Sequence, residues 1–126
     1  MKRSWIGLGL LIALAWGGLL VTRAMDAIHR PIAASLTDAG DQALAGNWQA
    51  AEALSRQAQE SWERSETFRA CFADHNPMEE IDSSFARLEV YARERKTAAF
   101  AAQCAEIARK AEAMGEAHSL KWENIF

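Results

Sequence analysis

The sequence predicts an all-α protein in which an N-terminal transmembrane helix is followed by a small antiparallel, up-and-down helical bundle. Two observations support this fold class. A run of 17 residues without charge extends from Trp5 to Val21. After it, apolar residues recur at spacings of three and four, which is the period of an amphipathic helix. The 26 alanines and only two prolines also favour helix, and 126 residues leave room for one domain.

Residues 1–24 are predicted to form a membrane anchor. A hydrocarbon core about 30 Å thick needs roughly 17 to 25 apolar helical residues, and the uncharged run meets the lower end of that range. A cleaved signal peptide is the alternative interpretation, because Lys2 and Arg3 form a short basic start. The apolar run exceeds the usual signal-peptide core of about 7 to 15 residues, so an uncleaved anchor is favoured.

The charges that flank the run indicate a topology. Lys2, Arg3 and the terminal amine lie on one side, and Arg23 and Arg30 lie on the other with Asp26 between them. The positive-inside rule then favours a single-pass protein of the cell membrane, with a cytoplasmic N-terminus and an extracytoplasmic body.

Composition excludes several classes of function. From residue 31 to residue 126 there are 10 basic and 16 acidic residues, a net charge of −6. A nucleic-acid partner is therefore not expected, since binding phosphates needs a basic surface. No nucleophile elbow, phosphate-binding loop or zinc spacing occurs, so we expect no enzyme, no cofactor and no catalytic residue. Cys71 and Cys104 are either buried separately or, in an oxidising space, paired.

The bundle, residues 25–126, is predicted to contain helices at about 25–45, 48–73, 77–95 and 97–114. Pro31 either kinks a helix continuous with the anchor or begins a second helix. Gly46 is expected to end the first helix and Asn47 to cap the next. The following helices are expected to be capped by Asn76 and Thr97, and Gly115 to mark the last end.

Core and solvent positions follow from the same periodicity. The expected core side chains are Trp48, Trp62, Phe72, Phe85 and Leu88. The histidines His29 and His118 have no companions in the sequence and are expected to be solvated.

One polar cluster, Asp74, His75, Glu79 and Glu80, offers candidate metal ligands or an acid–base pair. The alternative interpretation is a turn between helices, in which Asp74 and His75 satisfy backbone groups and the glutamates favour the positive end of the helix dipole. The second interpretation is favoured, because one histidine is too few for a transition-metal site.

The C-terminal segment, residues 119–126, places three large apolar residues among the last five: Trp122, Ile125 and Phe126. They are predicted to form a strap that packs back onto the bundle. Alternatively, they are the contact residues for a partner, which could also capture the terminal carboxylate.

Several landmarks recur together along the chain. They are the N-terminal anchor, Asn47-Trp48 with Ala51 and Leu54, Trp62, Phe72 before Asp74-His75, Ile81-Asp82 with Arg87-Leu88, and Ser119-Leu120 with Glu123-Asn124-Ile125-Phe126. With these features the chain resembles the domain-of-unknown-function family 4363, small single-pass proteins found mainly in Gram-positive, often spore-forming, bacteria. Pro31 and Asn76-Pro77 depart from the family pattern. The resemblance implies the architecture and membrane attachment, and it implies no activity.

The expected function is that of a membrane-tethered, non-catalytic helical domain that binds or scaffolds another membrane protein. The alternative is a sensor of a metal or small ligand centred on His75. The first hypothesis predicts an exposed apolar patch on the bundle. The second predicts a pocket where Asp74, His75 and a glutamate converge.

Overall fold

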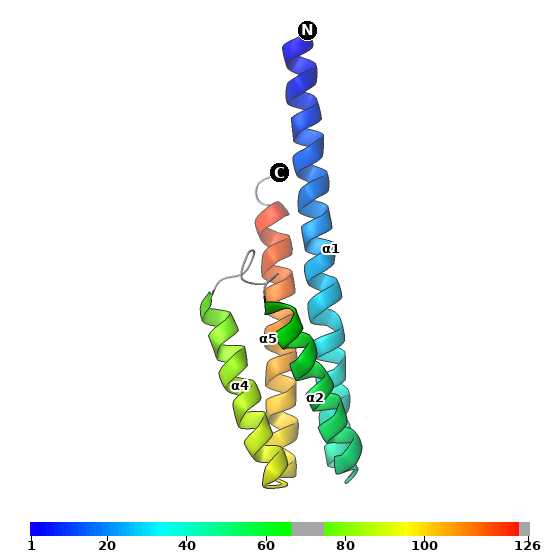
Figure 1. The fold of residues 1–126 in the computed structure, drawn as a ribbon, viewed down its shortest axis with the longest axis vertical. Helices are drawn as coiled ribbons and strands as arrows, with labels where there is room; N and C mark the ends of the chain where they lie inside the picture. Colours follow the sequence, from blue (N-terminus) through cyan, green and yellow to red (C-terminus); the bar gives the residue numbers. More distant parts are fainter. Residues whose placement is uncertain (67–74, 124–126) are drawn as a thin grey trace.

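The structure is a computed structural model that describes residues 1–66 and 75–123, and of residues 22, 25, 75–77 and 115–123 it describes the backbone alone. The described residues form the helices α1 (Lys2–Leu44), α2 (Trp48–Arg64), α4 (His75–Arg93) and α5 (Thr97–Glu123). Successive helices run antiparallel (Figure 1). α1 packs against α2 and α5, and α4 packs against α5. The predicted all-α, up-and-down fold is confirmed.

The first helix, α1, is continuous through Pro31. A proline inside a helix removes one backbone hydrogen bond and crowds the carbonyl four residues earlier. That carbonyl belongs to Ala27, and both residues lie on the exposed side of the helix, where water can serve as the replacement donor. No new helix therefore begins at Pro31, and the predicted division at residue 24 is not a helix boundary.

The two halves of α1 have different surroundings. Its first half exposes its large apolar side chains, among them Trp5, Leu10 and Leu20. Its second half buries Ile32 and Leu36, together with the small residues that follow at helical spacing. Among the described residues, α1 is the one helix long and apolar enough to cross a membrane, a test that an N-terminal signal sequence also passes.

The turn after α1 has the predicted chemistry. Gly46 adopts a left-handed φ of +84°, which glycine tolerates without steric cost. The Asn47 N–H donates to the Gln42 carbonyl (2.8 Å), which satisfies a carbonyl left over at the helix end. The Asn47 side-chain oxygen then accepts from the Ala50 N–H (3.4 Å) at the start of α2. Both predicted roles are confirmed.

The turn between α4 and α5 uses the same backbone motif without a glycine. Arg95 has a φ of +56°, and the Lys96 N–H donates to the Tyr91 carbonyl at 3.0 Å. A left-handed conformation costs a residue with a Cβ roughly 1–2 kcal/mol. The Lys96 carbonyl accepts from the Phe100 N–H (2.8 Å), so Thr97 is the first residue of α5 rather than its cap.

Three predicted helix ends were wrong. α2 ends at Arg64 rather than near residue 73, and the Ser65 hydroxyl donates to the Trp62 carbonyl (2.8 Å) at that end. α4 begins at His75, so Asn76 lies inside its first turn and is not its cap. α5 continues through Gly115 to Glu123, because an isolated glycine costs a helix only about 1 kcal/mol and the surrounding alanines favour helix. The predicted separate strap is thus helical as far as residue 123.

The core lies where the four helices meet. The predicted core residues Trp62, Phe85 and Leu88 are buried, whereas Trp48 is half-buried and Phe72 lies outside the described residues. The core also contains Ile32, Leu36, Ala39, Ala43, Ala51, Ala58, Ile81, Phe100, Cys104 and Ile107. Burial raises the pKa of the Cys104 thiol to about 12. Cys71 lies outside the described residues, so pairing of the two cysteines stays untested.

Candidate functional site: a groove between α2 and α4

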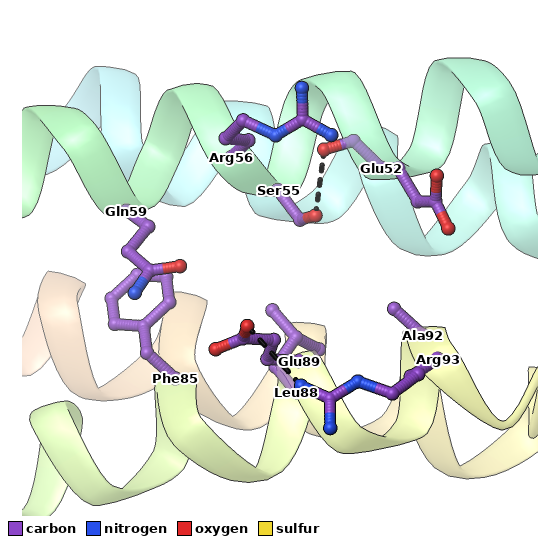
Figure 2. Close-up of a pocket in the computed structure, with 9 residues that line it drawn as sticks. All are labelled: Glu52, Ser55, Arg56, Gln59, Phe85, Leu88, Glu89, Ala92 and Arg93. Carbon is purple, nitrogen blue, oxygen red and sulfur yellow. Dashed lines mark hydrogen bonds and ion pairs between the residues drawn. The ribbon is translucent and has the colours of Figure 1, made fainter.

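The open side of the bundle lies between α2 and α4, which face each other across a groove of about 470 Å³ (Figure 2). The groove is lined by Glu52, Ser55, Arg56 and Gln59 from α2 and by Phe85, Leu88, Glu89, Ala92 and Arg93 from α4. Unlike the other adjacent helix pairs, α2 and α4 touch at few points. The groove therefore lies between two described helices that pack only sparsely on each other.

The sequence of α2 explains why the groove is open. The α2 residues at the groove have helical spacings of three, one and three, and all four are polar. The buried residues of α2, Ala51, Ala58 and Trp62, do not line the groove, and α2 packs mainly against α1. Across the groove, Phe85 and Leu88 of α4 lie opposite this polar face. Both side chains are nevertheless 97% buried. A polar stripe opposite an apolar one cannot interdigitate as a helix pair does in a core.

Toward the C-terminus of α2, next to the groove, a tryptophan joins α2 to α4. The Trp62 ring nitrogen donates to an Asp82 carboxylate oxygen at 2.6 Å, which joins α2 to α4. The Trp62 and Phe85 ring centroids are 6.5 Å apart. Figure 2 shows the Gln59 and Phe85 side chains directed toward each other from the facing helices. These contacts therefore connect α2 and α4 next to the groove.

Toward the N-terminus of α2, Arg95 contacts Glu52, which lines the groove. Its guanidinium lies 3.0 Å from a Glu52 carboxylate oxygen and 5.0 Å from the centre of the Trp48 ring. Trp48 in turn packs edge-on against Phe100, with centroids 5.1 Å apart. These contacts offset the energetic cost of the left-handed backbone at Arg95. A glycine at this position would avoid that cost but would make none of the contacts. A strained residue that joins α4, α2 and α5 is a feature that sequence reasoning missed.

The rim of the groove carries balanced charge. Glu89 pairs with Arg93 at 3.5 Å on the α4 side, and Glu52 is held by Arg95. Arg56 makes no ion pair within the described part of the chain. Exposed pairs of this kind are worth about 0–1 kcal/mol, so they add little to stability and can exchange partners readily. A ligand that offers a carboxylate could engage Arg56 without breaking an existing pair.

A buried histidine lies close to this site. His29, expected in solvent, is 2% exposed and packs edge-on against Trp62, with ring centroids 6.2 Å apart. The periodicity of α1 contained the signal, because His29 precedes the buried Ile32 and Ala33 by three and four residues. Ser84 is also buried, and its hydroxyl has no hydrogen-bond partner among the described residues. The side chain of His118 is not described.

The structure does not bring the predicted metal-ligand candidates together where it describes them. Asp74 lies outside the described residues, and His75 is described only as the first residue of α4. Glu79 and Glu80 are exposed, and Glu80 lies 3.8 Å from Lys110. No group of three or more His, Cys, Asp or Glu side chains in the described residues could hold a metal ion. The metal hypothesis thus stays a prediction.

The predicted partner contacts are described only in part. Trp122 belongs to the last turn of α5, of which the backbone is described, and Ile125 and Phe126 lie outside the described residues. The predicted exposed apolar patch is not found on the described bundle, where Leu44 and Val90 are the exposed large apolar residues.

Comparison with known proteins gives one match. No curated protein and no solved structure matches the chain. The family model described as Domain of unknown function (DUF4363) matches residues 19–125, which include the end of the apolar run and the bundle up to its penultimate residue. The chain therefore belongs to the domain-of-unknown-function family 4363, as its sequence landmarks predicted.

Proposed function

We propose that this chain is a membrane-tethered, non-catalytic helical domain that binds or scaffolds another membrane protein. The observation that carries the proposal is the continuity of α1. Its first half exposes apolar side chains along the length a bilayer requires, and its second half contributes Ile32 and Leu36 to the core of the bundle. The membrane span and the bundle share one helix, with no linker between them.

This continuity restricts where a partner can bind. A helix rises about 1.5 Å per residue, so Ile32 lies about 16 Å beyond Val21, and Leu44 lies about 35 Å beyond it. Because a continuous helix holds this spacing, the bundle stays within reach of the bilayer surface and cannot extend on a flexible tether. Its partner is therefore a protein that is itself embedded in, or held against, the same membrane.

The groove between α2 and α4 is the contact surface that the geometry favours. It combines a buried apolar floor, Phe85 and Leu88, with charged walls, which is the pattern of a protein interface with an apolar centre and a polar rim. Arg56 has no ion-pair partner among the described residues, so we expect the partner segment to carry a carboxylate opposite it. The sparse packing of α2 on α4 allows the groove to widen around that segment.

The proposed membrane topology of the chain follows from the charges that flank the apolar run. The amino terminus with Lys2 and Arg3 lies in the cytoplasm, and the bundle lies outside the cell membrane. A cysteine that replaces the exposed Glu112, in a chain with Cys71→Ser, should be labelled in intact cells by a membrane-impermeant thiol reagent. Labelling only after lysis would reverse the topology and leave the tether itself intact.

A site-specific photocrosslinking experiment tests the binding function. A photoreactive residue is placed in the full-length protein at Arg56 or at Glu89 on the groove rim, and at the exposed Gln57 as a matched control on α2. The two rim positions should yield the same crosslinked membrane protein, and position 57 should not. Equal products at all three positions, or none at the rim, would contradict the groove as the partner surface.

A further inference from the structure

The side chains on the two walls of the groove lie in register with one another. α2 and α4 run antiparallel, so a step toward the N-terminus of α2 matches a step toward the C-terminus of α4 (Figure 1). The Trp62–Asp82 hydrogen bond of 2.6 Å fixes one level of this register. Gln59 and Phe85 face each other at the next level (Figure 2). Because both helices rise about 1.5 Å per residue, the levels that follow can be assigned by counting.

This register places opposite charges across from each other. Arg56 lies three residues before Gln59, so it falls opposite the pair of residues 88 and 89. Glu52 falls one turn further along, opposite residues 92 and 93. Figure 2 shows the same order, with Glu89 across from Arg56 and Arg93 across from Glu52, and all four residues line the groove. The two walls are therefore complementary in charge.

The described conformation uses only part of this complementarity. Arg93 pairs with Glu89 on its own helix at 3.5 Å, and their side chains are 72% and 62% exposed. Arg56 has no ion-pair partner among the described residues, and Figure 2 shows its guanidinium turned away from α4. If Glu89 turned from Arg93 to Arg56, the freed Arg93 would still face Glu52, which Arg95 contacts at 3.0 Å. The exchange would thus give every charge on the groove walls an opposite charge beside it.

We propose that Arg56 and Glu89 form a reversible ion pair across the groove, which covers its apolar floor and competes with a partner carboxylate for Arg56. This inference rests on the proposed function, because the pair regulates access to the same groove. Both side chains are exposed and long enough to rotate toward each other across two sparsely packed helices. In the closed state they lie over Leu88, and a partner must displace Glu89. The structure shows the open state.

The accessibility of a thiol in the groove tests the pair in the purified protein, without a partner. The full-length chain with Cys71→Ser carries Ser55→Cys as the reporter, because Ser55 lines the groove. Its rate of reaction with uncharged N-ethylmaleimide is measured in detergent at low salt. The same rate is measured with Arg56→Gln, with Glu89→Gln and with both changes together.

Two further chains serve as controls. A chain with Cys71→Ser but without the reporter gives the background reaction of Cys104, which is buried. The reporter chain with Glu79→Gln controls for the loss of a charge on α4, since Glu79 is exposed and does not line the groove.

We expect Arg56→Gln and Glu89→Gln each to raise the reaction rate about twofold, because an exposed ion pair is favoured by only a small factor. The double variant should react no faster than either single variant. Electrostatics alone would give a different result, since loss of Arg56 raises the pKa of a nearby thiol and slows its reaction. Salt at about 1 M should accelerate the reporter chain that keeps both charges and leave the three variants unchanged.

Unchanged rates, or acceleration by only one of the two changes, would overturn the ion pair. Acceleration by Glu79→Gln would also overturn it, because any lost charge would then loosen the groove. Photocrosslinking in cells from position 55 separates this proposal from the proposed function. Glu89→Gln should raise the yield of the crosslinked membrane protein, and an unchanged yield would overturn the competition while the partner site stands. Absence of the product in every chain would overturn the proposed function and, with it, the regulation by this pair.

Discussion

Trp62 is the residue whose removal should cost the bundle most. It is 1% exposed, and its ring packs against His29 and Phe85. Its ring nitrogen also donates to Asp82 at 2.6 Å. Trp62→Ala therefore removes core volume and the one described side-chain hydrogen bond between α2 and α4 at the same time.

The expected loss in the free energy of unfolding comes from these two contributions. Replacing a buried tryptophan with alanine typically lowers the free energy of unfolding by about 3–5 kcal/mol. A hydrogen bond to a charged acceptor contributes about 1.5–3 kcal/mol, and the exposed Asp82 places this bond at the lower end because water can solvate the freed carboxylate. The free energy of unfolding of a small domain is only about 5–15 kcal/mol in total. Trp62→Ala should therefore leave the bundle close to unfolding.

A double-mutant cycle separates the bond from the packing. Unfolding of the full-length protein in detergent is followed by circular dichroism for wild type, Trp62→Phe, Asp82→Ala and the double variant. The two changes should be coupled by about 1–1.5 kcal/mol, because each alone already removes the bond. Glu89→Ala serves as the control, since loss of that exposed ion pair should change stability by less than about 0.5 kcal/mol.

Three results would refute this reasoning. Strict additivity in the cycle would show that the Trp62–Asp82 bond contributes nothing. An unchanged melting curve for Trp62→Ala would place the ring on the surface, where it would join the candidate partner contacts. A large effect of the Glu89 control would show that the fold responds to any change in α4.

Other residues give further tests. Arg95→Gly should be more stable than Arg95→Ala by about 1 kcal/mol in the same melting assay, because both lose the side-chain contacts but only glycine relieves the left-handed backbone; equal stability would contradict the strain. Cys104, in a Cys71→Ser chain, should resist maleimide until the protein unfolds. Its raised pKa contributes stability below about pH 9 that is lost as the pH rises toward about 12, so rapid native labelling would contradict its burial. His75→Asn should change stability by about 1 kcal/mol or less, and divalent metal should shift the melting temperature of neither protein; a shift lost in His75→Asn would favour the sensor hypothesis.

Periodicity predicted most of the fold because core formation depends on local spacing. The expected core residues Trp62, Phe85 and Leu88 are buried as predicted. The Gly46-Asn47 turn was also predictable, because glycine and asparagine have specific chemistry at helix ends. These features each depend on a few neighbouring residues, and a single sequence contains them.

The features that the sequence did not reveal depend on tertiary geometry. Arg95 gives no local signal for a left-handed turn, since the conformation is stabilised by Glu52 and Trp48 more than 40 positions earlier. The groove depends on which faces of α2 and α4 meet, and the packing of the whole bundle determines those faces. The candidate site was for this reason less predictable than the fold.

The central claim is that α1 stays whole and holds the bundle to the membrane. Intact-mass spectrometry of the protein from membranes washed with carbonate tests it most directly. We predict that the protein remains in the membrane pellet with residues 1–24 attached. A mature chain that begins near residue 25 and is recovered in the soluble fraction would contradict the claim.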